Sequence, residues 1–274
     1  MSDAEPVLAR IAAALEAMAP GGFGRTDWLA DPAYVWDSTA RPVHMISAPP
    51  LDLLKGIDAQ KERVAANVSR LALGHAAHDM LLWGARGMGK SALLRAAVAA
   101  AQAENPGAVA LVQIAPAALG SVSALFAALG QIDRRFLVFI DDLGFEDGDS
   151  TGPRALRSWL EGGVEARPGN VRLAVTSNRR AIVPRHLSEQ DDPVNPRDAV
   201  DDQLALADRF GLSLGFHACS QDDYLAIVAG YAAEHGLDWN EADALEWSKR
   251  RGARSGRVAW QFVTELAGTA GQQL

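Results

Sequence analysis

Residues 83–91 are Trp83-Gly84-Ala85-Arg86-Gly87-Met88-Gly89-Lys90-Ser91, and from Gly84 onward they match the phosphate-binding pattern G-x-x-x-x-G-K-[ST]. The apolar run Met80-Leu81-Leu82-Trp83 precedes this motif, and an alanine-rich run follows it. The order predicts a strand, a glycine-rich loop and a helix, which is the structural context that the motif requires. The alternative, an ordinary glycine-rich turn with an exposed lysine, is disfavoured by that context.

The residue types in this loop suit the binding of phosphate groups. Gly84, Gly87 and Gly89 allow the backbone to approach an anion closely, and backbone N–H groups at a helix start point toward it. Lys90 is expected to contact the β- and γ-phosphates of a nucleotide, and the Ser91 hydroxyl to ligate Mg²⁺. The predicted nucleotide contacts in this segment are Gly84, Ala85, Arg86, Gly87, Met88, Gly89, Lys90, Ser91 and Ala92.

Composition limits the class of protein. The chain has 274 residues, of which 49% are hydrophobic and 22% charged, as in ordinary globular proteins. Its formal net charge of −8 argues against a protein built mainly to coat nucleic acid. No apolar run is long enough to span a bilayer, and the first residues lack the features of a signal peptide. These features predict a soluble, cytoplasmic protein without a membrane partner. Cys219, the single cysteine, is expected to be buried and unreactive.

The segment before residue 51 is expected to be an N-terminal extension. Residues 5–18 carry apolar side chains at helical spacing, and Pro20-Gly21-Gly22 would end that helix. The stretch that follows is rich in proline and aromatic residues. It is predicted to be irregular, either packed on the core or serving as an arm for a partner. A further helix is predicted over residues 59–73.

After the glycine-rich loop, strands and helices alternate along the chain. Buried strands are predicted at residues 108–114, 135–140, 171–176 and 212–216. A helix capped by Ser121 is predicted between the first two of them. Alternation of this kind produces right-handed crossovers and a parallel sheet. The predicted fold class is therefore α/β, a parallel sheet flanked by helices of the P-loop NTPase type.

No strand is predicted after residue 220. Three helices fit at about 221–235, 240–251 and 255–267, with Trp239, Trp247 and Trp260 expected in their core. An all-helical tail after a phosphate-binding α/β domain suggests a lid. The predicted division is an N-terminal extension at 1–50, an α/β nucleotide-binding core at 51–218 and a helical lid at 219–274.

Polar residues follow two of the predicted buried strands. Asp141 ends the strand at 135–140 and is expected to hold Mg²⁺, directly or through water. Asp142 stands where a carboxylate that polarises the attacking water is usually placed. Asn178 follows the next strand and could orient that water. Because Ser-Asn is a common turn pair, the support for Asn178 comes from its place in this series.

With these motifs, residues 50–270 resemble the AAA+ ATPases. Residues 84–91 match the family's Walker A motif, residues 136–142 match Walker B, and Asn178 matches sensor 1. The resemblance implies an α/β core and a helical lid with Mg-ATP bound between them.

Three further positions have roles only through this resemblance. Gly56-Ile57-Asp58 is similar to the segment that lines the adenine pocket, which implies such a role for Ile57. Arg209 lies in a segment similar to the arginine-finger box. It would complete the site of a neighbouring subunit in a homo-oligomer, or simply pair with nearby acids. Arg257 lies in a segment similar to sensor 2. It would reach the γ-phosphate, or remain a solvated lid charge.

More narrowly, four runs are similar to DUF815, a bacterial group of unknown function. They are Gly56-Ile57-Asp58-Ala59-Gln60-Lys61, Asp141-Asp142-Leu143-Gly144-Phe145-Glu146, Thr176-Ser177-Asn178-Arg179-Arg180 and Ser255-Gly256-Arg257-Val258-Ala259. This resemblance implies a fold and a nucleotide, but no client.

The end of the Walker B segment departs from the AAA+ pattern. Most members have Asp-Glu there, whereas this chain has Asp141-Asp142. The shorter side chain of Asp142 would polarise water less well, and Glu146 is a candidate to serve instead. Rapid turnover is therefore in question, while ATP binding is not.

The sequence thus predicts an AAA+ ATPase that hydrolyses Mg-ATP to remodel or load an unidentified protein or nucleic-acid client. A slowly hydrolysing, ATP-dependent switch or scaffold is the second hypothesis, and Asp142 favours it. A P-loop kinase acting on a small molecule is the third, and the sensor and finger segments argue against it. GTP is disfavoured because the sequence has no Asn-Lys-x-Asp segment.

Overall fold

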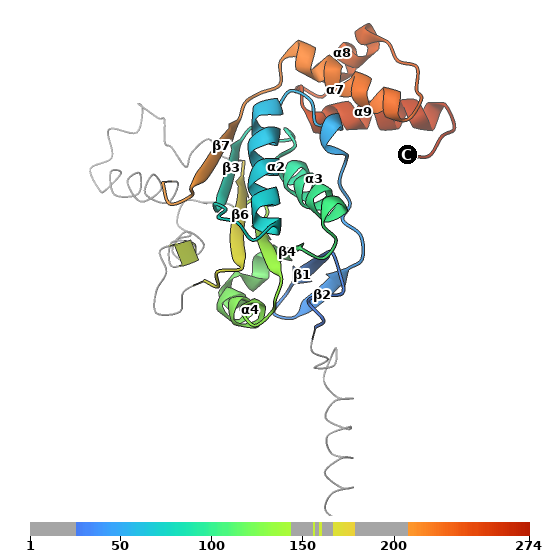
Figure 1. Cartoon of the computed structure of the whole chain (residues 1–274). Helices are drawn as coiled ribbons and strands as arrows, with labels where there is room; N and C mark the ends of the chain where they lie inside the picture. The colour runs from blue at the N-terminus through green and yellow to red at the C-terminus, as the bar shows by residue number, and fades with distance from the viewer. Residues whose placement is uncertain (1–25, 144–155, 157–158, 161–166, 179–207) are drawn as a thin grey trace, which may run out of the picture.

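The computed structural model describes residues 26–143, 156, 159–160, 167–178 and 208–274 (Figure 1). The predicted helix at 5–18, Glu146 and the irregular stretch at 181–202 lie outside the described residues. Within the described ranges, no helix combines the length and the apolar character that crossing a bilayer would need.

A sheet of seven strands forms the centre of the described structure, in the order β2-β1-β4-β5-β6-β3-β7. The strands are β1 (Ala33–Trp36), β2 (Ala40–Val43), β3 (Met80–Gly84), β4 (Val109–Ile114), β5 (Arg135–Ile140), β6 (Val171–Ser177) and β7 (Leu212–Phe216). All neighbouring pairs are parallel except β1 with β2. The predicted α/β fold with a parallel sheet is confirmed, with one antiparallel strand added at an edge.

That added edge corrects the prediction of an irregular stretch before residue 51. Strand β1 pairs in parallel with β4, and β2 turns back to pair with β1. The expected packing on the core does occur, because Trp28, Tyr34 and Trp36 are buried. Pro42 lies in β2, where an edge strand tolerates the missing N–H. The sheet therefore extends beyond the segment 51–218 assigned to the core.

Helices cover both faces of the sheet (Figure 1). Helices α2 (Asp58–Ala72) and α3 (Lys90–Glu104) pack on one face, and α4 (Val122–Leu129) packs on the other. Strand β5 shows why both faces are apolar: Leu137 and Phe139 join one core cluster, and Val138 joins the other. Strands buried on both faces are near-continuous apolar runs, which is why the sequence identified the central strands.

Ser121 does not cap α4 in the way that the sequence predicts. It occupies the N-cap position, but its side chain makes no capping hydrogen bond. Its hydroxyl donates to the carbonyl of Ala118 at 2.8 Å and accepts the indole N–H of Trp36, also at 2.8 Å. The short 3₁₀ helix Pro116–Ser121 brings that carbonyl within reach. Ser121 thus ties β1 to the loop before α4.

The C-terminal part of the chain is all-helical, as predicted. It consists of α7 (Gln221–Glu234), α8 (Glu241–Arg250) and α9 (Gly256–Thr269), which lie together beyond one end of the sheet (Figure 1). Side chains cap the start of each helix, namely Ser220, Asn240 and Ser255. Trp239 and Trp247 pack partly buried against the core, but Trp260 is 39% exposed. The expectation that Trp260 belongs to the lid core is therefore wrong.

Candidate functional site

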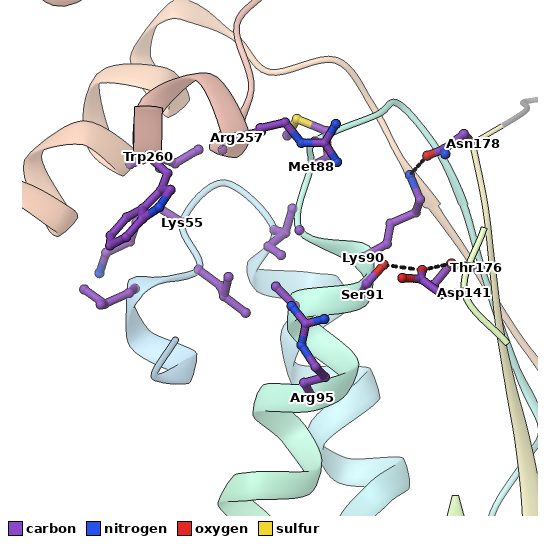
Figure 2. A pocket seen from close by; sticks show the side chains of 18 of the residues that line it. Lys55, Met88, Lys90, Ser91, Arg95, Asp141, Thr176, Asn178, Arg257 and Trp260 are labelled. Carbon is purple, nitrogen blue, oxygen red and sulfur yellow. Dashed lines mark hydrogen bonds between the residues drawn. The ribbon is translucent and has the colours of Figure 1, made fainter. Parts of the chain in front are cut away.

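The predicted site residues meet where three parallel strands end. Strand β3 runs between β6 and β7, and its residue Trp83 pairs with Ser177. Asp141 follows β5 and Asn178 follows β6. Carboxyl ends of parallel strands form the usual binding edge of an α/β sheet. A pocket of about 400 Å³ lies at this edge, between the sheet, α3 and the C-terminal helices (Figure 2).

The loop after β3 needs glycine at its first position for a steric reason. Gly84 has φ +118°, and a Cβ placed there would lie 2.2 Å from the carbonyl oxygen of Phe216. The next residue, Ala85, donates its N–H to that same oxygen at 2.8 Å. Close contact with the end of β7 thus fixes the start of the loop. Gly89, with φ +83°, then leads into α3.

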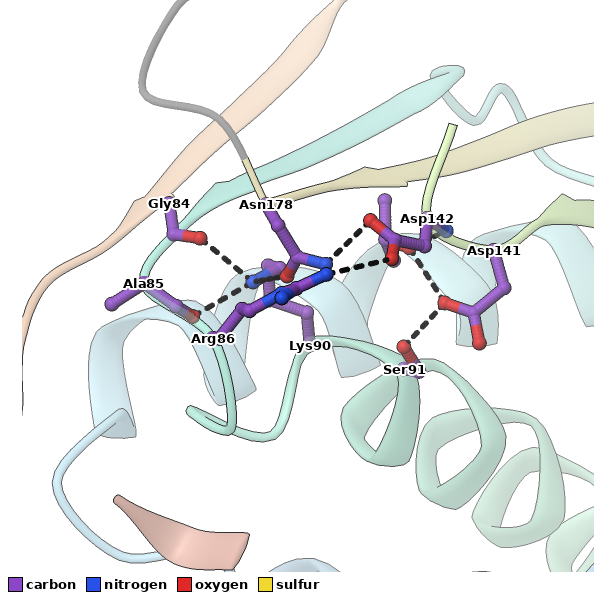
Figure 3. A network of polar contacts seen from close by, with 9 residues as sticks. Gly84, Ala85, Arg86, Lys90, Ser91, Asp141, Asp142 and Asn178 are labelled. Carbon is purple, nitrogen blue, oxygen red and sulfur yellow. Dashed lines mark hydrogen bonds and ion pairs between the residues drawn. The ribbon is translucent and has the colours of Figure 1, made fainter. Parts of the chain in front are cut away.

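Lys90 is the centre of the polar network, and it is buried rather than exposed. Its ammonium donates to the carbonyl oxygens of Gly84 at 2.9 Å and Ala85 at 2.8 Å. A third bond, of 3.1 Å, goes to the side-chain oxygen of Asn178 (Figure 3). Burial lowers the pKa of Lys90, and the carboxylates of Asp142 and Asp141 partly oppose that effect. The alternative of a turn with an exposed lysine is therefore excluded.

Ser91 and Asp141 lie together as the predicted metal ligands. The hydroxyl of Ser91 donates to Asp141 Oδ1 at 2.6 Å. The hydroxyl of Thr176 donates to the same carboxylate oxygen at 2.7 Å, and accepts the N–H of Asp142 at 2.8 Å. Thr176 is a site residue that was not predicted, although its place at the end of a buried strand could have identified it. It fixes the orientation of Asp141 toward Ser91.

Asp142 lies next to the network (Figure 3), and its side chain is 53% exposed. It is one of two described residues other than glycine with a positive φ, at +50°. The side-chain amide of Asn178 donates to its Oδ1, and a guanidinium nitrogen of Arg86 lies 3.8 Å from its Oδ2. Asn178 therefore links Lys90 to Asp142, and it lies directly after β6, where the sequence placed it.

The lid contacts the phosphate-binding loop through the start of α9. The backbone N–H of Arg257 donates to the carbonyl oxygen of Gly87 at 3.2 Å. A Cβ at Gly87 would lie 2.8 Å from Ser255 Oγ, and a Cβ at Gly256 would lie 3.1 Å from the Gly87 oxygen. The absence of a side chain at Gly87 thus leaves room for the lid. This contact brings Arg257 to the pocket wall.

The other end of the pocket is largely apolar and includes aromatic residues from the lid (Figure 2). Ile57, predicted for this region, lines it and is buried. Trp260 and Tyr231 line it too, with ring centroids 5.0 Å apart and the rings edge to face. Burial raises the pKa of Tyr231, so this ring stays neutral at ordinary pH. Tyr231 was not predicted and Trp260 was placed elsewhere, because helical spacing does not tell a core face from a pocket face.

Arg95 is a further pocket residue that the sequence patterns do not single out. It lies on α3 and lines the pocket on the side that faces Trp260 (Figure 2). Among the described residues, its Nε atom is buried and has no hydrogen-bond partner. A buried donor without an acceptor is costly, so this N–H is well suited to donate to an oxygen of a bound molecule.

Arg209 does not line the pocket that its own chain forms. It lies in the turn before β7, and β7 begins beside Met80 at the end of the sheet opposite the phosphate-binding loop. The length of β7, about 3.3 Å per residue, separates Arg209 from the loop of the same chain. Its predicted role thus requires a second chain. Glu146, the other predicted catalytic residue, lies outside the described residues.

The comparison with protein families decides the affiliation. A model described as "Protein of unknown function (DUF815)" matches residues 30–270. The chain belongs to the DUF815 family. No functionally curated protein shows significant sequence similarity to this DUF815 member.

Solved structures show which fold this family member has. A variant of Thermotoga maritima RuvB matches with a TM-score of 0.54 and 18% identity, covering 82% of this chain and 67% of RuvB. Aeropyrum pernix Orc1, in complex with DNA, matches with a TM-score of 0.54 and 16% identity, and the match covers 81% of this chain and 65% of Orc1. Hsp104 in a closed state with casein matches with a TM-score of 0.50 and 17% identity, and the match covers 78% of this chain and 37% of Hsp104. These proteins are AAA+ P-loop ATPases, so the DUF815 chain has an AAA+ fold. It spans about two thirds of the RuvB chains.

Proposed function

We propose that this protein binds Mg-ATP between its α/β core and its helical lid and hydrolyses the β–γ phosphoanhydride bond. The observation that carries the proposal is the meeting of Lys90, Ser91, Asp141 and Asn178 at one end of a pocket with an aromatic wall at the other end. The pocket volume of about 400 Å³ lies within the range of small-molecule sites.

The residues present fit the groups that this function implies. Ser91 and Asp141 offer a hydroxyl and a carboxylate 2.6 Å apart, and such oxygen ligands suit Mg²⁺. Bound there, Mg²⁺ would neutralise negative charge on the phosphates. Arg95 offers an unpaired donor to a phosphate or ribose oxygen. Trp260 offers a partly exposed indole ring in the pocket wall, against which a base could stack.

The geometry suits each polar residue to a task. Lys90, already desolvated, would exchange the carbonyl oxygens of its loop for phosphate oxygens. Asn178 would orient the attacking water, and Asp142 would accept its proton as the γ-phosphoryl group leaves ADP. Glu146 is the alternative proton acceptor. Arg257 would contact the γ-phosphate from the lid.

Removal of the Lys90 ammonium tests the proposal. Because Lys90 is buried, Lys90→Ala leaves two loop carbonyls facing an empty space, so the fold needs its own check by thermal melting. Lys90→Arg serves as the matched variant that keeps the charge. We expect folded Lys90→Ala to show no measurable Mg-ATP binding by calorimetry. Unchanged affinity in the folded variant would overturn the assignment of the phosphate site.

A second candidate is an ATP-dependent switch or scaffold that hydrolyses slowly. One observation favours it: both carboxylate oxygens of Asp142 are already engaged, one by Asn178 and one by Arg86. One of these contacts would have to open before Asp142 could contact the attacking water. Slow turnover of fully bound ATP would distinguish the switch from the fast remodelling enzyme.

We further propose that the active form is a homo-oligomer in which Arg209 acts on a neighbouring site. A guanidinium supplied from another subunit increases the rate about 10³- to 10⁵-fold in related P-loop enzymes. Arg209→Ala should bind ATP normally and turn over slowly, and mixing it with Lys90→Ala subunits should restore activity. Activity that is independent of protein concentration, without rescue on mixing, would leave Arg209 as an ion-pair partner.

The proposed output is the remodelling or loading of a macromolecular client in the cytoplasm. The structural neighbours do not select the client class: one is a Holliday junction branch migration motor, one is bound to DNA and one is bound to casein. The protein that co-purifies with Asp142→Asn, which should retain ATP, would identify it. We place the division between core and lid near residue 219, where β7 ends and α7 begins.

A further inference from the structure

We propose that Arg86 is a second γ-phosphate ligand, supplied by the phosphate-binding loop of the same chain. In this proposal Arg86 exchanges Asp142 for the γ-phosphate when ATP binds, and so releases Asp142 to act on water. The inference rests on the proposed function, because it needs ATP in the pocket. It adds a residue that distinguishes ATP from ADP without a second subunit and without the lid.

The first support is the position of Arg86 in the network. One guanidinium nitrogen lies 3.8 Å from Asp142 Oδ2 (Figure 3). The other oxygen of that carboxylate accepts from Asn178, which in turn accepts from Lys90. Arg86 is thus linked through Asp142 and Asn178 to Lys90, the residue that would bind the γ-phosphate.

The second support is the balance of charge in this network. Arg86 is linked directly to Asp142, and Lys90 is linked to it through Asn178. Two cationic side chains therefore share one carboxylate. A γ-phosphate that bridges Lys90 and Arg86 would supply a second anion between them.

The third support is the weakness of the present contact. The side chains of Arg86 and Asp142 are 75% and 53% exposed, and their nearest atoms are 3.8 Å apart. Ion pairs this exposed contribute little to stability and are readily exchanged. A guanidinium binds phosphate through two parallel hydrogen bonds, which are stronger. The exchange of partner is therefore favourable once a γ-phosphate arrives.

The chemical step then has a clear order. With Arg86 on the γ-phosphate, Asp142 keeps only its contact with Asn178 and regains a free oxygen. Water attacks the γ-phosphorus, and the bond from that phosphorus to the β–γ bridging oxygen breaks. The water proton passes to Asp142, and ADP and inorganic phosphate are released. Arg86 stabilises charge on the transferred group and returns to Asp142 when phosphate leaves.

The test compares two nucleotides that differ by the γ-phosphate. Calorimetry on the full chain measures the affinity for Mg-ADP and for Mg-AMPPNP, an ATP analogue that resists hydrolysis. The variants are Arg86→Ala and Arg86→Lys, with Arg63→Ala, an exposed arginine on α2 outside the site, as the control. We expect Arg86→Ala to lose about 10- to 100-fold in AMPPNP affinity while its ADP affinity is unchanged. Arg86→Lys should recover part of the loss.

The other outcomes are decisive as well. The proposal is overturned if Arg86→Ala changes neither affinity. It is also overturned if the affinities for AMPPNP and ADP fall by the same factor, which would indicate a general distortion of the loop. Failure of the wild-type chain to bind either nucleotide rejects the proposed function itself, so the two failures are distinguishable. In the Arg209→Ala background, Arg86→Ala should still lower the remaining turnover, since Arg86 acts within one chain.

Discussion

The two ends of the pocket are built in different ways. At the end where we propose that phosphate binds (the phosphate end), side chains already bind one another: Lys90 donates to Asn178, and Ser91 donates to Asp141. They extend from strand ends and a helix start that the sheet fixes in place. At the other end, where we propose that the nucleoside binds (the nucleoside end), part of the wall comes from the lid, and its largest aromatic, Trp260, is 39% exposed. The phosphate end is therefore preorganised, whereas the nucleoside end depends on where the lid lies.

This difference predicts how the two ends fail. Loss of Asp142, the proposed proton acceptor at the phosphate end, should slow the chemical step and leave the lid in place. Changes at the lid should weaken nucleotide binding and leave the chemical groups unaltered. The junction between the two ends is a backbone contact, from the N–H of Arg257 to Gly87, so small shape changes there should act on both.

Among the variants that separate the chemical step from the lid contacts, the largest effect is expected from Asp142→Asn, at the phosphate end. Loss of a general base typically costs about 10²- to 10⁴-fold in rate, while ATP affinity should stay close to that of the wild type. Steady-state phosphate release and calorimetry measure the two quantities. Glu146→Gln is the matched variant. If it stops hydrolysis and Asp142→Asn does not, Glu146 is the group that accepts the proton.

A smaller effect is expected from Trp260→Ala, at the lid end. Stacking of a base on an aromatic side chain is worth about 1–3 kcal/mol, so ATP affinity should fall roughly 5- to 150-fold. Saturating ATP should restore turnover to the wild-type level. Trp260→Phe should keep most of the affinity. A fall in turnover at saturation would contradict the division of labour between the two ends.

A change at the junction should be milder. In Gly256→Val, the added side chain would meet the Gly87 carbonyl, since even a Cβ lies 3.1 Å from it. Loss of one hydrogen bond between lid and loop predicts a fall in ATP affinity of about 2- to 10-fold. Gly268→Val is the control on the same helix, because a Cβ there meets nothing within 4 Å. Equal effects of the two variants would show that helix propensity, not the junction, is responsible.

The smallest effect concerns Cys219, which lies between β7 and α7 and is 8% exposed. Burial raises the pKa of its thiol from 9.0 to about 11, so the reactive thiolate at pH 8 is roughly a hundredfold scarcer than in an ordinary thiol. Alkylation by iodoacetamide should therefore be slow in the folded protein. Saturating Mg-ATP should slow it modestly further if binding holds the lid in place. Faster labelling with ATP would indicate that the lid opens instead.

The sequence predicted which residues meet at this end of the pocket, and the reason is physical. Strands buried on both faces are continuous apolar runs, and the polar residues that end them are few. Asp141 and Asn178 could therefore be placed on one sheet edge from their order alone. Lys90 was harder, because its burial depends on carbonyls of its own loop that turn toward it. No sequence pattern indicates the direction in which these carbonyl groups point.

The sequence failed where tertiary contacts decide. Strands β1 and β2 are four residues each, and Pro42 in the second argues against a strand unless the edge position is known. Trp260 has the same helical spacing as some core residues of α9. Its side chain lines the pocket because the start of α9 lies against the loop at Gly87 (Figure 2). Arg95 was missed because nothing in a helix sequence marks a donor that lacks an acceptor.

The contact of α9 with Gly87 has a mechanical consequence. Helix α9 has 14 residues, so it is about 21 Å long at 1.5 Å per residue. Its amino end bears on the phosphate-binding loop, and the rest of it extends away as a rigid arm. A tilt of roughly 10° at that pivot would move the far end by about 4 Å. A sub-ångström displacement of the loop that tilted α9 by this angle would therefore be magnified severalfold at the far end of the helix.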